Sequence, residues 1–125
     1  MNNKSVQAVK RFLDERGWFD TAPANLAKSI SIESAELLEH FQWSNPSAEE
    51  VRRDPEVLGK ISKELADVLI YAFHMTSMLG LDVDAIVEGK LEHAGKKYPV
   101  DKVKGPAGSA VYKKLKQEYR DKGIN

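Results

Sequence analysis

Apolar residues recur three or four positions apart along nearly the whole chain, and this helical spacing constrains the fold more than any other feature. No stretch alternates strictly between apolar and polar residues with turn signals at both ends, as a half-buried strand would. With 125 residues, the chain has room for one domain of ordinary size. We therefore expect an all-α, four-helix-bundle-like fold.

Local signals predict where the helices begin and end. The expected helices cover residues 6 to 17, 25 to 41, 54 to 79, 82 to 97 and, in a basic stretch, 110 to 122. Asn25 is the predicted N-cap of the second helix, and Asp54 before a proline predicts the next N-cap. Ser47 and Glu50 have capping-box spacing, which predicts a short helical turn. Gly17 and Gly80 are predicted C-terminal stops.

Composition excludes several classes of protein. The chain has no cysteine, which removes disulfide scaffolds, zinc–thiolate sites and cysteine nucleophiles. Its net charge of zero argues against binding to a nucleic-acid polymer. No apolar run approaches the roughly 18–20 residues of a membrane span. We therefore expect a cytoplasmic protein without a membrane anchor.

Charge is unevenly distributed along the chain. Residues 1–89 hold 9 basic and 15 acidic groups, whereas residues 90–125 hold 10 basic and 4 acidic groups. This split indicates either attraction between the acidic body and the basic tail or a ligand that needs both signs. A tail that is simply solvated explains it equally well.

Carboxylates lie where two helices should pack. Glu33 falls within an apolar stripe of the second helix, formed by Leu26, Ile30, Leu37 and Phe41, and Glu36 follows at i+3. The third helix is apolar nearly all round from Leu65 to Phe73, so we expect other helices to surround it. Glu64 and Asp67 lie in this neighbourhood, again at i and i+3.

If the two helices pack together, the two acidic pairs converge. Like charges at close range cannot all remain ionised without a partner. A divalent cation would satisfy them, and an all-oxygen ligand set favours Mg²⁺, with Mn²⁺ as the other candidate. The alternative is that these acids form ion pairs with Lys28, Lys60 or Lys63 on a hydrated surface.

Several segments resemble the MazG-like nucleotide pyrophosphohydrolases, which belong to the all-α NTP pyrophosphatases. The resemblance rests on SISIESAELLEHFQW at Ser29–Trp43, ELADVLIYAFHM at Glu64–Met75 and KLEHAGKKYPVDKVKG at Lys90–Gly105. It is strongest to the small single-domain branch that includes dCTP pyrophosphatases. It implies a helical catalytic domain over residues 1–105, followed by a basic, partly helical tail over residues 106–125.

The resemblance implies hydrolysis of a nucleoside triphosphate to the monophosphate and pyrophosphate. It places Glu33, Glu36, Glu64 and Asp67 at four Mg²⁺-binding positions, and Glu33 or Glu36 also activates the attacking water. Further implied positions are Lys90, Lys97 and Tyr98 for phosphate, and Trp43, Tyr71 and Trp18 for the base. It also implies a homodimer or homotetramer, and an enzyme that removes dCTP-like or modified nucleotides from the cellular pool.

Two departures from the family pattern bear on the substrate. Ala94 stands where the family usually has an asparagine. Either His93 takes the role of that asparagine, or the activity and the substrate preference differ from those of the family. The segment Phe19–Pro23 lacks the histidine that dCTP-type members often carry.

Other functions stay open at this point. A phosphoribosyl-ATP pyrophosphohydrolase would use the same metal chemistry. A non-catalytic helical module is a different class, and it includes a phosphotransfer bundle with His74 or His40 as the acceptor. His74 lies in an apolar run. It could contact a ligand, or it could be a hydrogen-bonded histidine packed in the core.

Overall fold

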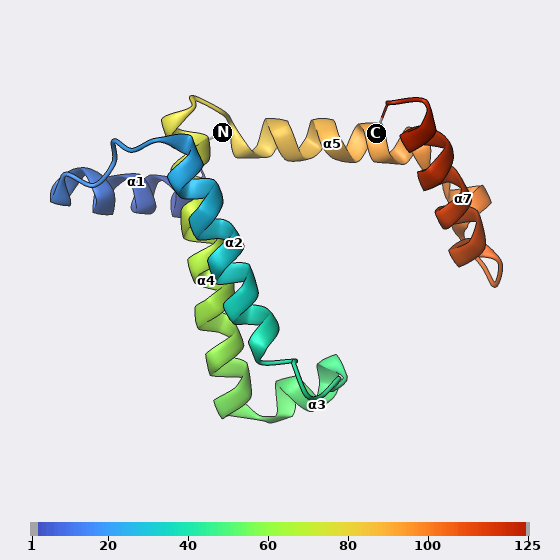
Figure 1. Cartoon of the computed structure of the whole chain (residues 1–125), viewed down its shortest axis with the longest axis horizontal. Coiled ribbons are helices and arrows are strands. Elements are labelled where there is room, and N and C mark those ends of the chain that lie inside the picture. The colour runs from blue at the N-terminus through green and yellow to red at the C-terminus, as the bar shows by residue number, and fades with distance from the viewer. Residues whose placement is uncertain (1–2, 125) are drawn as a thin grey trace. The chain divides into compact units, whose positions relative to one another are not determined.

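The computed structural model describes residues 3–124, which form seven helices and no strand. This confirms the predicted all-α class. The helices are α1 (Lys4–Arg16), α2 (Pro23–Glu39), α3 (Ala48–Arg53), α4 (Pro55–Met78), α5 (Val83–Lys97), α6 (Val100–Val103) and α7 (Gly108–Asp121) (Figure 1). Contacts divide the chain into two compact units, one ending at Val83 and one beginning at Asp84.

In the first unit, α2 packs along α4, and α1 and α3 also contact α4 (Figure 1). The buried apolar side chains are Leu13, Leu26 and Ile61, one from each of the three longest helices of this unit. Most other side chains on the packing face of α2 are partly buried, Glu33 among them. The predicted stripe of this helix is thus the face that meets α4.

The predicted helix caps are mostly present. Gly17 ends α1 with φ of 67°, a left-handed conformation that glycine adopts without a steric penalty. Ser47 Oγ accepts from Glu50 N–H at 3.1 Å, which caps α3. Asp54 accepts from Glu56 N–H and Val57 N–H at 3.1 and 3.2 Å, which fixes the start of α4.

The predicted N-cap of α2 is wrong. The helix begins at Pro23, with Ala22 as its N-cap and no side-chain cap, and Asn25 lies inside its first turn. Proline at the first helical position has its φ already set for a helix, so the helix starts two residues earlier. The Asn25 side chain instead donates to Thr21 Oγ1 at 3.1 Å.

Within the first unit, other helices surround α4 only in part, whereas the sequence pattern predicts that helices surround it. Leu65, Leu69 and Ile70 are 45%, 50% and 41% exposed. The first unit offers only α1, α2 and α3 as helices that contact α4, and they leave part of its surface open. An apolar face of α4 therefore remains uncovered by the other helices of the first unit.

The second unit contains α5, α6 and α7. The short helix α6 packs against α7, and the sequence pattern does not predict it. A Cβ atom at Gly108 would collide with the carbonyl oxygen of Val103, so the approach of these helices requires glycine there. The predicted helix at 110–122 is confirmed as α7.

No single helix of the described residues is long and apolar enough to cross a membrane; only α4 and α5 taken together, across the bend between them, reach that length and composition.

Candidate metal centre and adjoining cavity

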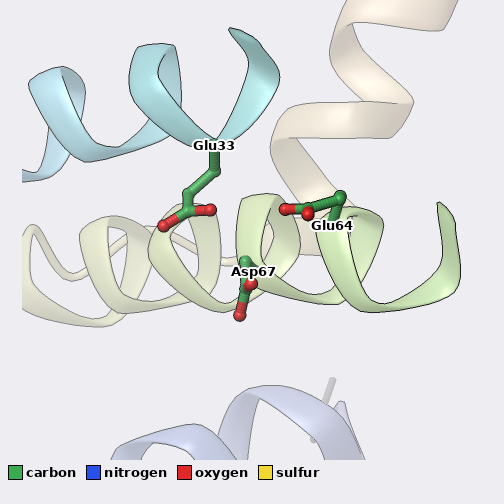
Figure 2. A group of neighbouring side chains, drawn as sticks. All are labelled: Glu33, Glu64 and Asp67. Atoms are coloured by element: carbon green, nitrogen blue, oxygen red, sulfur yellow. The ribbon is translucent and has the colours of Figure 1, made fainter. Parts of the chain in front are cut away.

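Three of the four predicted acidic ligands meet between α2 and α4. Glu33, Glu64 and Asp67 each offer an oxygen, and these oxygens all lie within 4.8 Å of one another. Figure 2 shows Glu33 reaching from α2 toward α4, which carries Glu64 and Asp67 one turn apart. The spacing of three residues brings the α4 pair to neighbouring positions, and the packing of α2 adds the third carboxylate. We call these three residues the acidic group.

Among residues 3–124, no lysine or arginine forms an ion pair with the acidic group. Glu33 Oε2 is buried and has no hydrogen-bond partner among residues 3–124. A hydrogen bond with the Glu36 side chain, burial, and then the negative charges of Glu36, Asp67 and Glu64 raise the pKa of Glu33 above its ordinary value. Each of these effects disfavours the ionised carboxylate when no cation is nearby.

The lysines considered as alternative partners do not reach the acidic group. Lys60 Nζ forms its ion pair with Glu56, at 3.1 Å. Across the described part of the chain, no ion pair joins Lys28 or Lys63 to these carboxylates. The orphaned oxygen of Glu33 and the all-carboxylate donor set therefore fit a hard divalent cation such as Mg²⁺ or Mn²⁺.

Glu36, the fourth predicted ligand, lies beside the acidic group and outside it. It is exposed on α2, one turn after Glu33, and its side chain interacts with that of Glu33. Its role as a ligand or as the base stays a prediction.

His40 is a neighbour of the acidic group that the ligand prediction missed. Its Nε2 atom lies 3.4 Å from Glu64 Oε1. The signal was present in the sequence, because His40 follows Glu33 by seven residues and Glu36 by four, on the same helical face.

A cavity of about 480 Å³ adjoins the acidic group and shares Asp67 with it. Trp18 and Tyr71, two of the predicted base-binding residues, both line this cavity. Its other walls are formed by residues of α1, α2, α4 and the loop before α2, namely Phe12, Leu13, Thr21, Asn25, Leu26, Ser29, Ile70 and His74. A mostly apolar hollow with a few polar groups is typical of a small-molecule site.

Trp43, the third predicted base-binding residue, does not line this cavity. It lies beyond the end of α2 and is 89% exposed. Its role stays a prediction.

The predicted phosphate-binding residues belong to the second unit. Lys90 is exposed on α5, whereas Lys97 is only 7% exposed. The ammonium of Lys97 lies 5.1 Å from the ring centres of both Tyr98 and Tyr119, within cation–π range. Tyr98 stacks on Tyr112 with centroids 4.8 Å apart. Burial, followed by the interactions with Tyr112, raises the pKa of Tyr98 above its ordinary value.

A model of the MazG-like family matches residues 28–118, a span that includes the whole acidic group. The chain belongs to the MazG-like family. The resemblance drawn from the sequence segments is thereby confirmed.

A pyrophosphatase from Archaeoglobus fulgidus is a similar protein of known crystal structure. It shares 41% sequence identity with this MazG-like chain, and the TM-score is 0.63. The match covers 77% of this chain and 90% of that one. A comparison with curated proteins found no significant match. Family membership and this likeness together support a pyrophosphohydrolase, and they favour an enzyme over a non-catalytic helical module.

Proposed function

We propose that this protein is a divalent-metal-dependent nucleoside triphosphate pyrophosphohydrolase that releases a nucleoside monophosphate and pyrophosphate. One observation carries the proposal. Glu33, Glu64 and Asp67 converge within 4.8 Å, and Asp67 also lines a cavity with aromatic walls. A site for a cation therefore lies directly beside a space suited to a flat ring, which is the arrangement that a nucleotide needs.

The acidic group would hold Mg²⁺, or Mn²⁺ in its place, with Glu36 available from the next turn of α2. When bound, such an ion neutralises phosphate charge and makes water easier to deprotonate. The need for a cation is supported by the orphaned Glu33 oxygen and by the repulsion among these carboxylates.

Glu33 is the first candidate for the base, and Glu36 is the second. Both assignments rest on the family pattern, and Glu33 is partly buried beside the other carboxylates of the acidic group. The water oxygen forms a bond to the α-phosphorus while the bond from that phosphorus to the bridging oxygen of the pyrophosphate breaks. The proton of the water passes to the carboxylate, and pyrophosphate leaves with the bridging oxygen.

The aromatic residues would bind the nucleobase, and the basic ones the phosphates. Trp18 and Tyr71 line the cavity beside Asp67, which supports a stacking role. We keep Trp43 as a third base-binding candidate, and Lys90, Lys97 and Tyr98 as phosphate-binding candidates, on the strength of the family pattern. The catalytic domain would then include residues 1–105, with residues 106–125 as its tail.

The substrate we propose is a deoxynucleoside triphosphate, either dCTP-like or carrying a modified base. Hydrolysis of such a compound to its monophosphate would keep it out of DNA, as a pool-sanitising enzyme does. The cytoplasm, where such pools are used, is the corresponding location.

A second copy of this chain would cover the exposed face of α4. Leu65 and Leu69 are about half exposed on the helix that carries Glu64 and Asp67. Apolar side chains of this size in one row are costly to leave in water. A homodimer or homotetramer would bury them and complete the bundle.

The test is pyrophosphate release from the four standard dNTPs, a set of base-modified dNTPs and phosphoribosyl-ATP, each with and without Mg²⁺. We expect metal-dependent release from one or a few of the dNTPs. Release from phosphoribosyl-ATP alone would favour the related enzyme class. No release from any compound, at protein concentrations that bind Mg²⁺, would contradict the proposal.

A further inference from the structure

His74 is one of two buried polar side chains among residues 3–124, and it is 5% exposed. It lies on α4, and its Nε2 atom is 2.6 Å from the carbonyl oxygen of Phe19, 55 residues earlier in the chain. A carbonyl oxygen can only accept, so the proton of this bond sits on Nε2. The His74 and Phe19 rings also lie against each other, with centroids 5.5 Å apart and planes inclined by 32°.

The bond joins α4 to the loop between α1 and α2. At one end of this loop, Trp18 N–H donates to Leu13 O at 2.9 Å. At the other end, Asn25 donates from its side chain to Thr21 Oγ1 at 3.1 Å. The bond from His74 holds the backbone between these ends, at the residue that directly follows Trp18.

Trp18 depends on this loop for its position. It is 60% exposed, and the ring that meets it edge-on is Phe12, at 6.2 Å between centroids. Trp18 nevertheless forms a wall of the cavity that Tyr71 and His74 also line. Because more than half of the tryptophan side chain is exposed, the backbone beside it contributes to where that wall lies.

We infer that His74 is a positioning residue for the nucleobase: by fixing the Phe19 carbonyl, it holds Trp18 as a wall of the cavity and sets which bases fit. This inference rests on the proposed function, because it needs the cavity to receive a base. It assigns His74 a place in the wall of the cavity and no contact with the reacting atoms.

The experiment compares three variants with the wild type. His74→Leu removes the donor and keeps an apolar side chain of similar size. His74→Gln retains an N–H donor and serves as the rescue. Thr76→Val is the matched control, since Thr76 Oγ1 donates to Phe73 O at 2.8 Å within α4 and its loss leaves the loop bond intact. Should His74→Leu fail to fold, His74→Met also lacks the donor and takes its place.

Two readouts are made on each protein. The first is hydrogen–deuterium exchange of the backbone amides at residues 17–22. The second is calorimetric binding, with Mg²⁺, of dNTP analogues in which carbon replaces the oxygen between the α- and β-phosphates. For His74→Leu, we expect the rate of loop exchange and the Kd each to rise by about tenfold, the scale of one lost hydrogen bond. The differences in Kd among the bases should become smaller. His74→Gln should restore most of both, and Thr76→Val should change neither loop exchange nor Kd.

Unchanged loop exchange in His74→Leu would overturn the inference, and so would faster exchange with unchanged Kd and base preference. A wild type that binds the analogues but releases no pyrophosphate from dNTPs would contradict the proposed function. The binding measurements on the His74 variants would then test the inference by themselves. A wild type that binds no analogue would overturn both.

Discussion

The Nε2 atom of His40 lies 3.4 Å from Oε1 of Glu64, which joins the end of α2 to the acidic group on α4. Both side chains are partly buried, at 28% and 21% exposure. Such a contact restrains the carboxylate and leaves it fewer orientations to lose when it binds a cation.

His40→Ala should therefore weaken binding of Mg²⁺ or Mn²⁺ by about tenfold, the lower end of what loss of a supporting residue costs. Isothermal titration of the metal into the nucleotide-free protein measures this. His40→Gln, which keeps a hydrogen-bonding group, should lie closer to the wild type. Equal affinity in His40→Ala and the wild type would show that the contact has no such role.

Glu64→Gln should lower Mg²⁺-dependent pyrophosphate release by about 100-fold or more, because an amide is a poor replacement for a charged ligand. The helical circular dichroism spectrum should not change. Glu56→Gln is the control, since Glu56 lies on the same helix, 78% exposed, and pairs with Lys60. Full turnover by Glu64→Gln would contradict the assignment of the metal centre.

Glu33→Gln should remove activity and at the same time stabilise the metal-free protein near neutral pH. The pKa of Glu33 is raised above its ordinary value of 4.5, so the folded state holds this proton more tightly than the unfolded state does. The stability due to the protonated form is thus present below about pH 4.5 and is lost as pH rises through the folded-state pKa.

Thermal unfolding in EDTA between pH 4 and pH 8 tests this prediction. The Tm of Glu33→Gln should exceed that of the wild type at neutral pH, with the gap closing toward pH 4. Added Mg²⁺ should raise the Tm of the wild type but not that of the variant. A variant that is less stable than the wild type at neutral pH in EDTA would refute the electrostatic account.

Asp54→Ala should destabilise the protein by about 1 kcal/mol, the usual cost of losing an N-cap. Asp54 accepts from the backbone N–H groups of Glu56 and Val57 at the start of α4. This helix carries two members of the acidic group. Urea unfolding measures the change. Asp54→Asn can cap the helix equally well and should leave the free energy of unfolding nearly unchanged. Equal losses of stability in the two variants would contradict the capping explanation.

Leu69→Glu should shift the protein toward the monomer of 14.0 kDa in sedimentation velocity at micromolar concentration. Leu69 is 50% exposed on the face of α4 that we assign to a second copy. Lys60→Ala changes the net charge by the same amount elsewhere on α4 and should leave the assembly intact. A wild type that is already monomeric would contradict the assembly.

The sequence by itself determined the long helices and the polar segments between them, though not the short helix α6 or the N-cap of α2. Caps such as Ser47 and Asp54 act through backbone groups two or three residues away, so they can be identified from neighbouring residues alone. The placement of Glu33 within an apolar stripe follows from helical periodicity, as does the pairing of Glu64 with Asp67. Those features, with the quoted family segments, were enough to predict an acidic metal site and its class of chemistry.

Only the tertiary structure decided which residues from separate helices meet. Periodicity assigns a residue to a face, but the axial register of one helix against another depends on how all their side chains pack. For that reason it was the packing of α2 on α4 that brought Glu33 to the acidic pair, and His40 to Glu64. The bond from His74 to Phe19 spans 55 residues, a distance over which no local pattern specifies a partner.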